Sequence, residues 1–352
     1  MKSLSAQDIS SLNGLLHGCS SFVIVTHTHP DGDALGSTLA LQEFIAAMPG
    51  KKVSAIVPDA VPSTMDFLCN GRGVIDASAD PGKAAALIAG CEVLVCLDFN
   101  AFRRTEALAP LLEASSASKV LVDHHLNPDS GSFGLCFSCT EVSSACELLY
   151  EVLKALPDVG GDPERLPLFT RYALMTGMTT DTNNFANSVY PGTLRMAGEL
   201  LESGVDRDEI IDRLYRQDRP QKIHAFADLL GSHLEIFPGG IACMYMSEAL
   251  RAAYDISDGE TEGLVNIPLG MAQVRLSIFA REENGVIRVS LRSKPGLSSN
   301  DMAKRYFHGG GHELASGGKI FIPEDIPGES GARDYIAAAA ARFLQDDGGP
   351  EK

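Results

Sequence analysis

The stretch that decides the fold of this chain runs Phe22-Val-Ile-Val-Thr-His27-Thr-His-Pro-Asp31-Gly-Asp33-Ala-Leu-Gly36-Ser37. Its apolar, mostly β-branched start predicts a buried strand, and an amphipathic helix is expected over residues 34–47. His27, Asp31 and Asp33 therefore fall on one short loop between the strand and the helix. In a parallel α/β sheet such a loop lies at the carboxyl end of a strand, where ligands bind.

This loop has two interpretations. Two carboxylates and an imidazole in so short a loop suit a divalent cation, and Mn²⁺ accepts mixed carboxylate and imidazole ligands. Alternatively, Asp33 caps the helix and His27 is an ordinary residue at a strand end. Two further predicted strands also end on such side chains, Asp98 in one and Asp123-His124-His125 in the other. This gathering at strand ends favours the metal.

The N-terminal part of the chain predicts an α/β domain. Predicted strands at 52–57, 93–98 and 119–123 alternate with helical segments, which indicates a mostly parallel sheet with helices on both faces. A predicted helix over 166–177 leads to Asp181, a further acidic candidate. We expect this domain to span residues 1–190.

The pattern of apolar and polar residues is different in the remainder of the chain. Residues 191–236 read as helices and are interpreted as a linker. From 237 to 345 alternating patterns predict a second, smaller domain of mixed α/β type. Within it, the pair Asn284-Gly285 between two strand patterns is typical of a hairpin turn.

Six residues at these strand and helix ends form the expected metal-binding set: His27, Asp31, Asp33, Asp98, His124 and Asp181. Six such ligands suit two adjacent divalent metals with one bridging carboxylate. A metal pair of this kind activates a bridging hydroxide and neutralises charge on a phosphoryl group under attack. His125, next to a ligand, is the candidate that contacts the scissile phosphate or protonates the leaving oxygen. We therefore expect phosphoester or phosphoanhydride hydrolysis.

A second group of residues points to phosphate binding. Gly309-Gly310-Gly311-His312 offers backbone N–H groups that a phosphate can approach closely, although three glycines alone also suit a flexible turn. Arg292-Ser293-Lys294 ends the preceding strand pattern, and a guanidinium can grip a phosphate with two hydrogen bonds. Arg104 follows Asp98 closely and is a further candidate, with a solvated helix start as the alternative.

The composition bounds the partners. The 352 residues carry a net charge of −17, which does not suit a protein that wraps long duplex DNA, so a nucleic-acid substrate is expected to be short. No apolar run reaches the ~20 residues of a membrane span, and no signal peptide is recognisable, so a cytoplasmic location is expected. Eight cysteines suggest no disulfide framework, and Cys136-Phe-Ser-Cys139 lacks the second pair of a zinc site.

The motifs as a set resemble those of the DHH phosphoesterase superfamily and its associated C-terminal domain, over roughly residues 20 to 322. They are the opening stretch, Asp123-His124-His125, Thr180-Asp181-Thr182, Ser290-Leu-Arg292-Ser293-Lys294 and Gly309-Gly-Gly-His312-Glu-Leu-Ala315-Ser-Gly317. The subgroup that the chain most resembles is that of the two-domain nanoRNases (oligoribonucleases) and pAp phosphatases.

The resemblance implies particular roles. Two Mn²⁺ ions would be held, one by His27, Asp31 and Asp98 and the other by Asp33, Asp98, His124 and Asp181, with Asp98 bridging. His125 would contact the scissile phosphate, supported by Asp123. The distal part of the substrate would be held in an interdomain cleft by Arg292, Ser293, Gly309, Gly310, Gly311 and His312.

The expected function is thus a Mn²⁺-dependent phosphoesterase. It would degrade very short RNA to mononucleotides, in either the 3′–5′ or the 5′–3′ direction, and dephosphorylate 3′-phosphoadenosine 5′-phosphate (pAp) to AMP. The alternatives are a phosphodiesterase for cyclic di-AMP or linear pApA, and a catalytically silent nucleotide sensor. No membrane partner is expected, and a homodimer is compatible with the sequence. Two departures from the family pattern, Phe99 and Asn183-Asn184, bear on specificity; Phe99 is expected to narrow the pocket.

Overall fold

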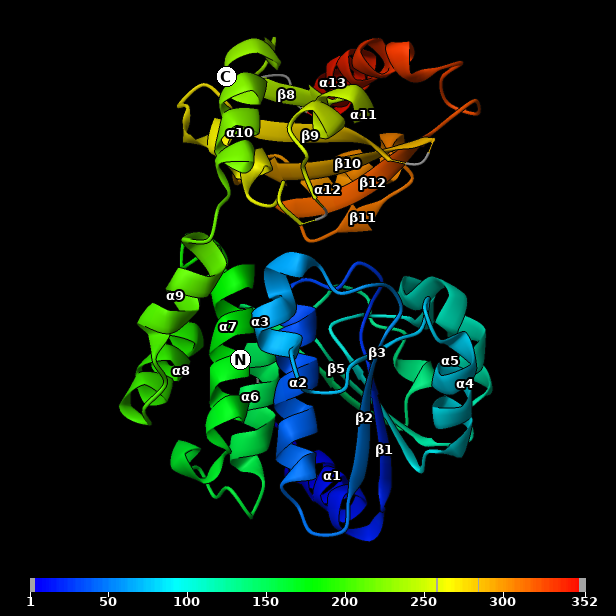
Figure 1. Ribbon diagram of the computed structural model, residues 1–352, viewed down its shortest axis with the longest axis vertical. Helices are drawn as coiled ribbons and strands as arrows, with labels where there is room; N and C mark the ends of the chain where they lie inside the picture. The colour runs from blue at the N-terminus through cyan, green and yellow to red at the C-terminus, as the bar shows by residue number, and fades with distance from the viewer. Residues whose placement is uncertain (1–3, 258, 284, 348–352) are drawn as a thin grey trace. The chain divides into compact units, whose positions relative to one another are not determined.

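The chain divides into two compact units. The structure, a computed structural model, describes residues 4–257, 259–283 and 285–347. The N-terminal unit is Met1–Gln217 and the C-terminal unit is Asp218–Lys352. The predicted linker 191–236 contains three helices and the first residues of a strand, and the division between the two units falls inside it. Helices α8 (Pro191–Glu202) and α9 (Arg207–Tyr215) belong to the N-terminal unit, whereas α10 (Pro220–Ser232) belongs to the C-terminal unit (Figure 1).

The N-terminal unit is built on a six-stranded sheet in the order β3-β2-β1-β4-β5-β6, and every neighbouring pair is parallel. Its strands are β1 (Ser21–Val25), β2 (Lys52–Val57), β3 (Ile75–Asp76), β4 (Val93–Leu97), β5 (Ser118–Asp123) and β6 (Leu135–Ser138). The predicted parallel sheet is confirmed. The edge strands β3 and β6 had no counterpart in the sequence patterns, because each is short and lies next to turns.

Helices cover both faces of this sheet, as expected. They are α1 (Ala6–Gly18), α2 (Gly32–Ala46), α3 (Asp66–Cys69), α4 (Pro81–Gly90), α5 (Ala109–Ala114), α6 (Ala145–Ala155) and α7 (Leu168–Asp181). Alternate residues of β1 explain the two layers. Phe22 and Ile24 join the core cluster that contains residues of α1, α2, α6 and α7. Val23 and Val25 join a second cluster with residues of α4 and α5. A strand buried on both faces reads as a continuous apolar run.

The C-terminal unit has a mixed six-stranded sheet in the order β11-β12-β10-β9-β8-β7. Its strands are β7 (Leu234–Phe237), β8 (Ile241–Met246), β9 (Leu276–Glu283), β10 (Val286–Ser293), β11 (Gly310–Gly311) and β12 (Ala315–Phe321). Only β8 and β9 pair in parallel. The predicted hairpin is confirmed by the antiparallel register of Glu283 with Val286; Asn284 of its turn lies outside the described residues.

Helices also cover the second sheet. They are α10, α11 (Glu248–Ala253), α12 (Ser299–Tyr306) and α13 (Ala332–Asp347). Residues of α12 and α13 pack with Leu276 and Ile278 in one core cluster, and residues of α10 pack with Met244 and Phe279 in another. Among the described residues, no helix combines the length and the apolar character needed to cross a membrane.

Candidate metal centre

Neighbouring strands of the parallel sheet bring three candidate side chains together. His27 follows β1, Asp98 follows β4 and His124 follows β5, and these strands are adjacent. The Nε2 atom of His27 lies 3.3 Å from Oδ2 of Asp98, and the Nε2 atom of His124 lies 3.4 Å from Oδ1 of the same residue. Asp98 adopts φ +63°, the left-handed region that Asp tolerates better than most residues. Two histidines thus flank one buried carboxylate.

The start of helix α2 supplies two further carboxylates. Asp31 is the N-cap of α2, and its Oδ1 atom accepts hydrogen bonds from the N–H groups of Asp33 and Ala34 at 3.1 and 3.0 Å. The capping role suggested for Asp33 therefore belongs to Asp31. Asp33 lies within the first turn, is 1 % exposed and places Oδ2 3.8 Å from Nε2 of His124.

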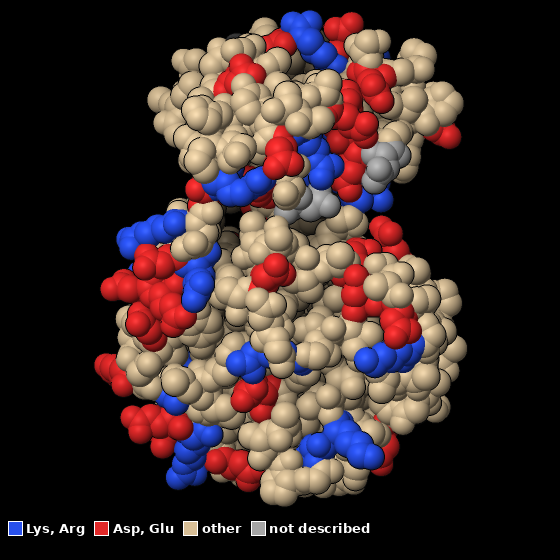
Figure 2. Space-filling model, viewed as in Figure 1, with Lys and Arg blue, Asp and Glu red and all other residues tan. Residues whose placement is uncertain are grey.

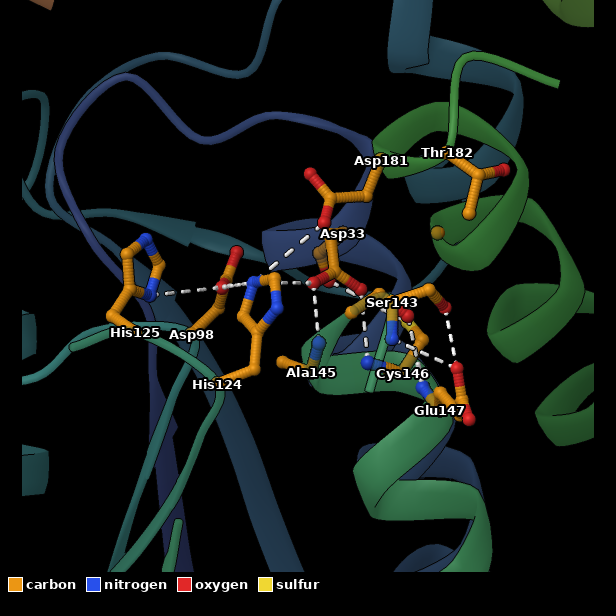
Figure 3. Close-up of polar contacts among 12 residues, drawn as sticks. Asp33, Asp98, His124, His125, Ser143, Ala145, Cys146, Glu147, Asp181 and Thr182 are labelled. Carbon is orange, nitrogen blue, oxygen red and sulfur yellow. Dashed lines mark hydrogen bonds and ion pairs between the residues drawn. The ribbon is translucent and has the colours of Figure 1, made fainter. Parts of the chain in front are cut away.

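Asp181, the last residue of α7, completes this group. Its Oδ2 atom lies 3.6 Å from Nε2 of His124, and Asp33, His124 and Asp181 lie toward one another in Figure 3. Two sets of possible donor atoms each lie within 4.8 Å of one another: His27, Asp31 and Asp98, and Asp33, His124 and Asp181. The structure therefore brings all six predicted ligands into one place.

The electrostatics of the centre suit a cation. Burial, together with the Asp98 and Asp181 carboxylates, raises the pKa of Asp33 well above its usual range. Burial alone would lower the pKa of His124, but the hydrogen bond to Asp98 and the charge of Asp181 outweigh it and raise that pKa to about 10. Burial likewise disfavours ionised Asp98, yet His124 and His27 hold the pKa of Asp98 well below its usual range.

One oxygen atom among these possible metal ligands has incomplete hydrogen bonding within the protein. Among the described residues, Oδ1 of Asp98 is buried and contacts Nε2 of His124 at 3.4 Å, but no group meets it with the geometry of a full hydrogen bond. A buried carboxylate oxygen without a full hydrogen bond is costly unless it is compensated. Carboxylate and imidazole donors at this density match the ligand preferences of divalent metals such as Mn²⁺. The donor set therefore fits a metal.

His125 is held by a buried carboxylate. Its Nδ1 atom lies 2.7 Å from Oδ1 of Asp123, a residue that is fully buried. Burial lowers the pKa of His125, although the hydrogen bond to Asp123 acts in the opposite direction. The hydrogen bond at Nδ1 fixes the orientation of the imidazole. The carboxylate of Asp123 thus contacts the Nδ1 side of the His125 ring.

Arg104 also lies near the metal centre. It belongs to the 3₁₀ segment Phe102–Leu108, and its carbonyl oxygen accepts from the N–H and the hydroxyl of Thr28 at 2.9 and 3.0 Å. These bonds tie the loop after β1 to the segment after β4. Burial and the Arg104 guanidinium both lower the pKa of His27, and Asp98 and Asp31 together outweigh them and raise it.

The C-terminal candidates are arranged differently from the expected clamp. Arg292 and Ser293 are successive residues of β10, and successive strand residues face opposite sides of a sheet. Arg292 is half-buried and its Nη1 donates to the Leu291 carbonyl at 3.0 Å. Ser293 is buried, and its Oγ has no hydrogen-bond partner among the described residues. A ligand held by both side chains from one face of β10 does not follow from this geometry.

The glycine-rich stretch follows α12 instead of preceding a helix, and its N–H groups are used within the unit. Gly309 donates to the Ala303 carbonyl at 3.1 Å, and Gly311 donates to Oδ1 of Asn300 at 3.0 Å. A Cβ atom at Gly309 would lie 1.9 Å from the carbonyl oxygen of Gly317. Glycine is therefore needed here because β11 approaches β12 closely, and the expectation of available N–H groups is wrong for Gly309 and Gly311. Phosphate contacts from Arg292, Gly310 and His312 stay predictions.

Acidic and histidine side chains at the carboxyl ends of parallel strands suit metal-assisted hydrolysis, including that of phosphate esters. The model of the DHH family, N-terminal domain, matches residues 21–178, and that of the DHHA1 domain matches residues 241–328. The chain therefore contains a DHH-family N-terminal domain and, after it, a DHHA1 domain.

Several known proteins are similar over nearly the whole chain. A bifunctional oligoribonuclease and PAP phosphatase NrnA from Bacillus subtilis is 28% identical, over 86% of this chain and 90% of its own. Its namesake from Thermus thermophilus is also 28% identical, over 84% of this chain and 83% of its own. The crystal structure of an exopolyphosphatase-related protein from Bacteroides fragilis is 29% identical, with a TM-score of 0.89 over 98% of each chain.

Sequence reasoning missed the groups that hold Asp33. The N–H groups of Ala145 and Cys146, at the start of α6, donate to Oδ2 and Oδ1 of Asp33 at 2.6 and 2.9 Å. The available signal was Ser144, whose residue type is typical of a helix N-cap. The first N–H groups of a helix have no partner within the helix and can bind another group. What no pattern indicated is that the carboxylate of Asp33 occupies this helix start.

Phe99, one of the two departures from the family pattern, is a core residue. The ring is fully buried in the cluster that includes Phe102 and Phe133, with its centroid 6.4 Å from that of Phe102. The expectation that Phe99 narrows the pocket is therefore wrong. The Phe99 side chain lies among apolar residues of this cluster.

Replacing Phe99 with leucine is expected to lower the free energy of unfolding by about 1–2 kcal/mol, because part of a buried ring is lost from a packed cluster. Urea denaturation of the metal-free protein measures this change. The ratio of the rates on pApA and pAp should stay as in the wild type. A changed ratio at unchanged stability would instead place the ring against the substrate.

Proposed function

We propose that this protein is a phosphoesterase that hydrolyses very short oligoribonucleotides to mononucleotides and converts pAp to AMP. One observation carries the proposal: six Asp and His side chains, of the types that can bind a metal, converge at the carboxyl edge of the parallel sheet, with Asp98 between two histidines. The names of the relatives from Bacillus subtilis and Thermus thermophilus support this substrate class.

The metals that we propose are two divalent ions, preferentially Mn²⁺. His27, Asp31 and Asp98 would hold one, and Asp33, His124 and Asp181, again with Asp98, would hold the other. When bound, such ions supply a water of lowered pKa and offset the negative charge that develops on the phosphoryl oxygens. The donor sets and the unsatisfied Oδ1 atom of Asp98 support this assignment.

The remaining steps belong to the side chains of the protein. In its imidazolium form, which the hydrogen bond to Asp123 favours against the effect of burial on the pKa, His125 would donate the Nε2 proton to the leaving oxygen of the substrate. Asp123 would keep the ring oriented through its bond to Nδ1. Because Asp123 and His125 are both buried, the proton is held away from bulk water. Arg104, on the segment tied to the loop after β1, would pair with a substrate phosphate.

The charge of the protein supports a small substrate. On the face shown in Figure 2, acidic side chains gather over α9, whose first turn contains Asp208 and Glu209, and basic side chains lie beside this group and at scattered places on the rest of the face. With a net charge of −17, long-range attraction of an extended polyanion is unfavourable. A short anion that is neutralised locally by metals and a few arginines avoids this cost.

The test compares metal-stripped protein with and without added Mn²⁺ on four substrates: pApA, pAp, a long single-stranded RNA and cyclic di-AMP. We expect Mn²⁺-dependent loss of pApA and pAp, with the long RNA spared, when products are separated by chromatography. Preferential loss of cyclic di-AMP would replace the proposal with signal turnover. Absence of turnover despite bound Mn²⁺ would indicate a nucleotide sensor.

A further inference from the structure

Glu147, which no part of the proposed chemistry uses, is a buried carboxylate with an unusual set of partners. It lies in the first turn of α6 and is 2 % exposed. Its Oε2 atom accepts from the N–H and the hydroxyl of Ser143 at 2.8 and 2.6 Å, and from the hydroxyl of Thr193 at 2.6 Å. All three donors are neutral. Burying a carboxylate whose hydrogen-bond donors are all neutral costs free energy. A functional role for Glu147 would account for this cost.

These bonds fix the start of α6. Ser143 immediately precedes Ser144, the N-cap whose hydroxyl accepts from the Glu147 N–H at 2.9 Å. Thr193 lies in the first turn of α8, so Glu147 also ties the starts of two helices together. The other oxygen is enclosed as well, because a Cβ atom at Gly192 would lie 2.5 Å from Oε1.

The start of α6, which Glu147 fixes, also donates hydrogen bonds to Asp33. Ala145 and Cys146, the first two residues of α6, donate one N–H each to the two oxygens of Asp33. Figure 3 shows the complete path, from Glu147 through Ser143 and the start of α6 to Asp33, which lies toward His124 and Asp181. The path consists of hydrogen bonds of 2.9 Å or less.

We propose that Glu147 is a positioning residue for the metal centre: it holds the start of α6 so that the N–H groups of Ala145 and Cys146 orient the carboxylate of Asp33 for metal binding. This inference rests on the proposed function, because it assigns Asp33 to a metal. Partners behind a metal ligand commonly change metal affinity by about 10- to 100-fold when they are removed. Glu147 acts one step further away, through backbone donors.

The primary test measures Mn²⁺ affinity without substrate, by titration of the metal-stripped protein with the free-ion Mn²⁺ paramagnetic resonance signal as readout. Glu147→Ala should weaken Mn²⁺ binding by about tenfold. Glu147→Gln keeps one acceptor oxygen for the same three donors but removes the charge, so it should weaken binding by less than about threefold. Equal losses in both variants would mean that the charge alone acts, and would overturn the proposal.

Tyr150→Phe is the matched control. Tyr150 is a buried residue of the same helix, and its hydroxyl donates to Glu199 on α8 at 2.5 Å. This variant also removes a bond between α6 and α8, but not at the helix start. Thermal unfolding of each metal-free variant reports its stability. Unchanged Mn²⁺ affinity in Tyr150→Phe, despite lowered stability, supports the proposal; a loss equal to that of Glu147→Ala contradicts it.

The double variant with Asp33→Asn tests the route. If Glu147 acts through Asp33, then Glu147→Ala should cause little further loss of Mn²⁺ affinity once Asp33 is replaced. Losses that add in full would exclude this route. Wild-type protein that binds no Mn²⁺ would refute the proposed function and this inference together, whereas normal binding by wild type and Glu147→Ala alike would refute the inference alone. Should Glu147→Ala fail to fold, the same cycle is run with Ser143→Ala, which removes the hydroxyl that donates to Glu147.

Discussion

Asp98→Ala is expected to lower Mn²⁺-dependent hydrolysis of pApA by at least about 1000-fold, equivalent to about 4 kcal/mol of lost transition-state stabilisation. The reason is the position of Asp98, whose two oxygens face His27 and His124 at 3.3 and 3.4 Å. Its removal would separate the two proposed metal positions and leave both histidines without their shared carboxylate. Turnover at saturating pApA and the metal content of the purified variant are the measurements.

Asp59→Ala is the control for the Asp98 variant. Asp59 follows β2 at the same edge of the sheet, and its carboxylate accepts from the His29 N–H at 2.7 Å. The Asp59→Ala substitution removes an acidic group from the same edge but none of the six proposed ligands. Activity and metal content should therefore stay close to those of the wild type. An Asp98→Ala protein that still turns over pApA at a tenth of the wild-type rate would refute the two-metal assignment.

His125→Ala is expected to lower kcat on pApA by about 100- to 10,000-fold, the usual contribution of a positioned general acid, while Mn²⁺ affinity is retained. The imidazole is buried and held by Asp123 at 2.7 Å, so no water or neighbouring side chain reproduces its position. Parallel measurement of kcat and of Mn²⁺ binding separates loss of the acid from loss of the metals.

The nature of the leaving group sharpens this test. A p-nitrophenyl phosphodiester releases an oxygen that needs little protonation, so the same variant should lose less than about tenfold on it. An equal loss on both substrates would show that His125 does not protonate the leaving oxygen. His29→Ala is the matched control, since His29 lies on the same loop as His27 but faces Asp59, with Nδ1 3.4 Å from Oδ2; its turnover should be nearly unchanged.

The parts of this protein that the sequence predicts well are those with strong local signals. β1, β4 and β5 contain apolar runs, and an Asp or His lies at or just after the carboxyl end of each strand, so the parallel sheet and the gathering of candidate ligands at its edge were expected. β3 and β6 are only two and four residues long, and so short a segment has no periodicity to detect. The N-cap assignment differed by two residues, which is the usual uncertainty of a helix start.

Other features depend on tertiary contacts that no local pattern encodes. Phe99 follows a strand, and only the packing of Phe102 and Phe133 decides that its ring enters the core. The N–H group of Gly309 is satisfied by Ala303, and its lack of a side chain is required by Gly317 across the strand pair. A glycine chosen for close backbone contact and one chosen to bind phosphate look alike in a sequence.

The order of the strands in the N-terminal sheet has a consequence for folding kinetics. β1 lies between β2 and β4, and the Thr26 hydroxyl reaches the carbonyl of Leu97, 71 positions along the chain. Closing so long a loop is slow and comes with the formation of the sheet itself. The set of donors around Asp98 therefore exists only after that step, and Mn²⁺ should prolong the lifetime of the native state without accelerating refolding.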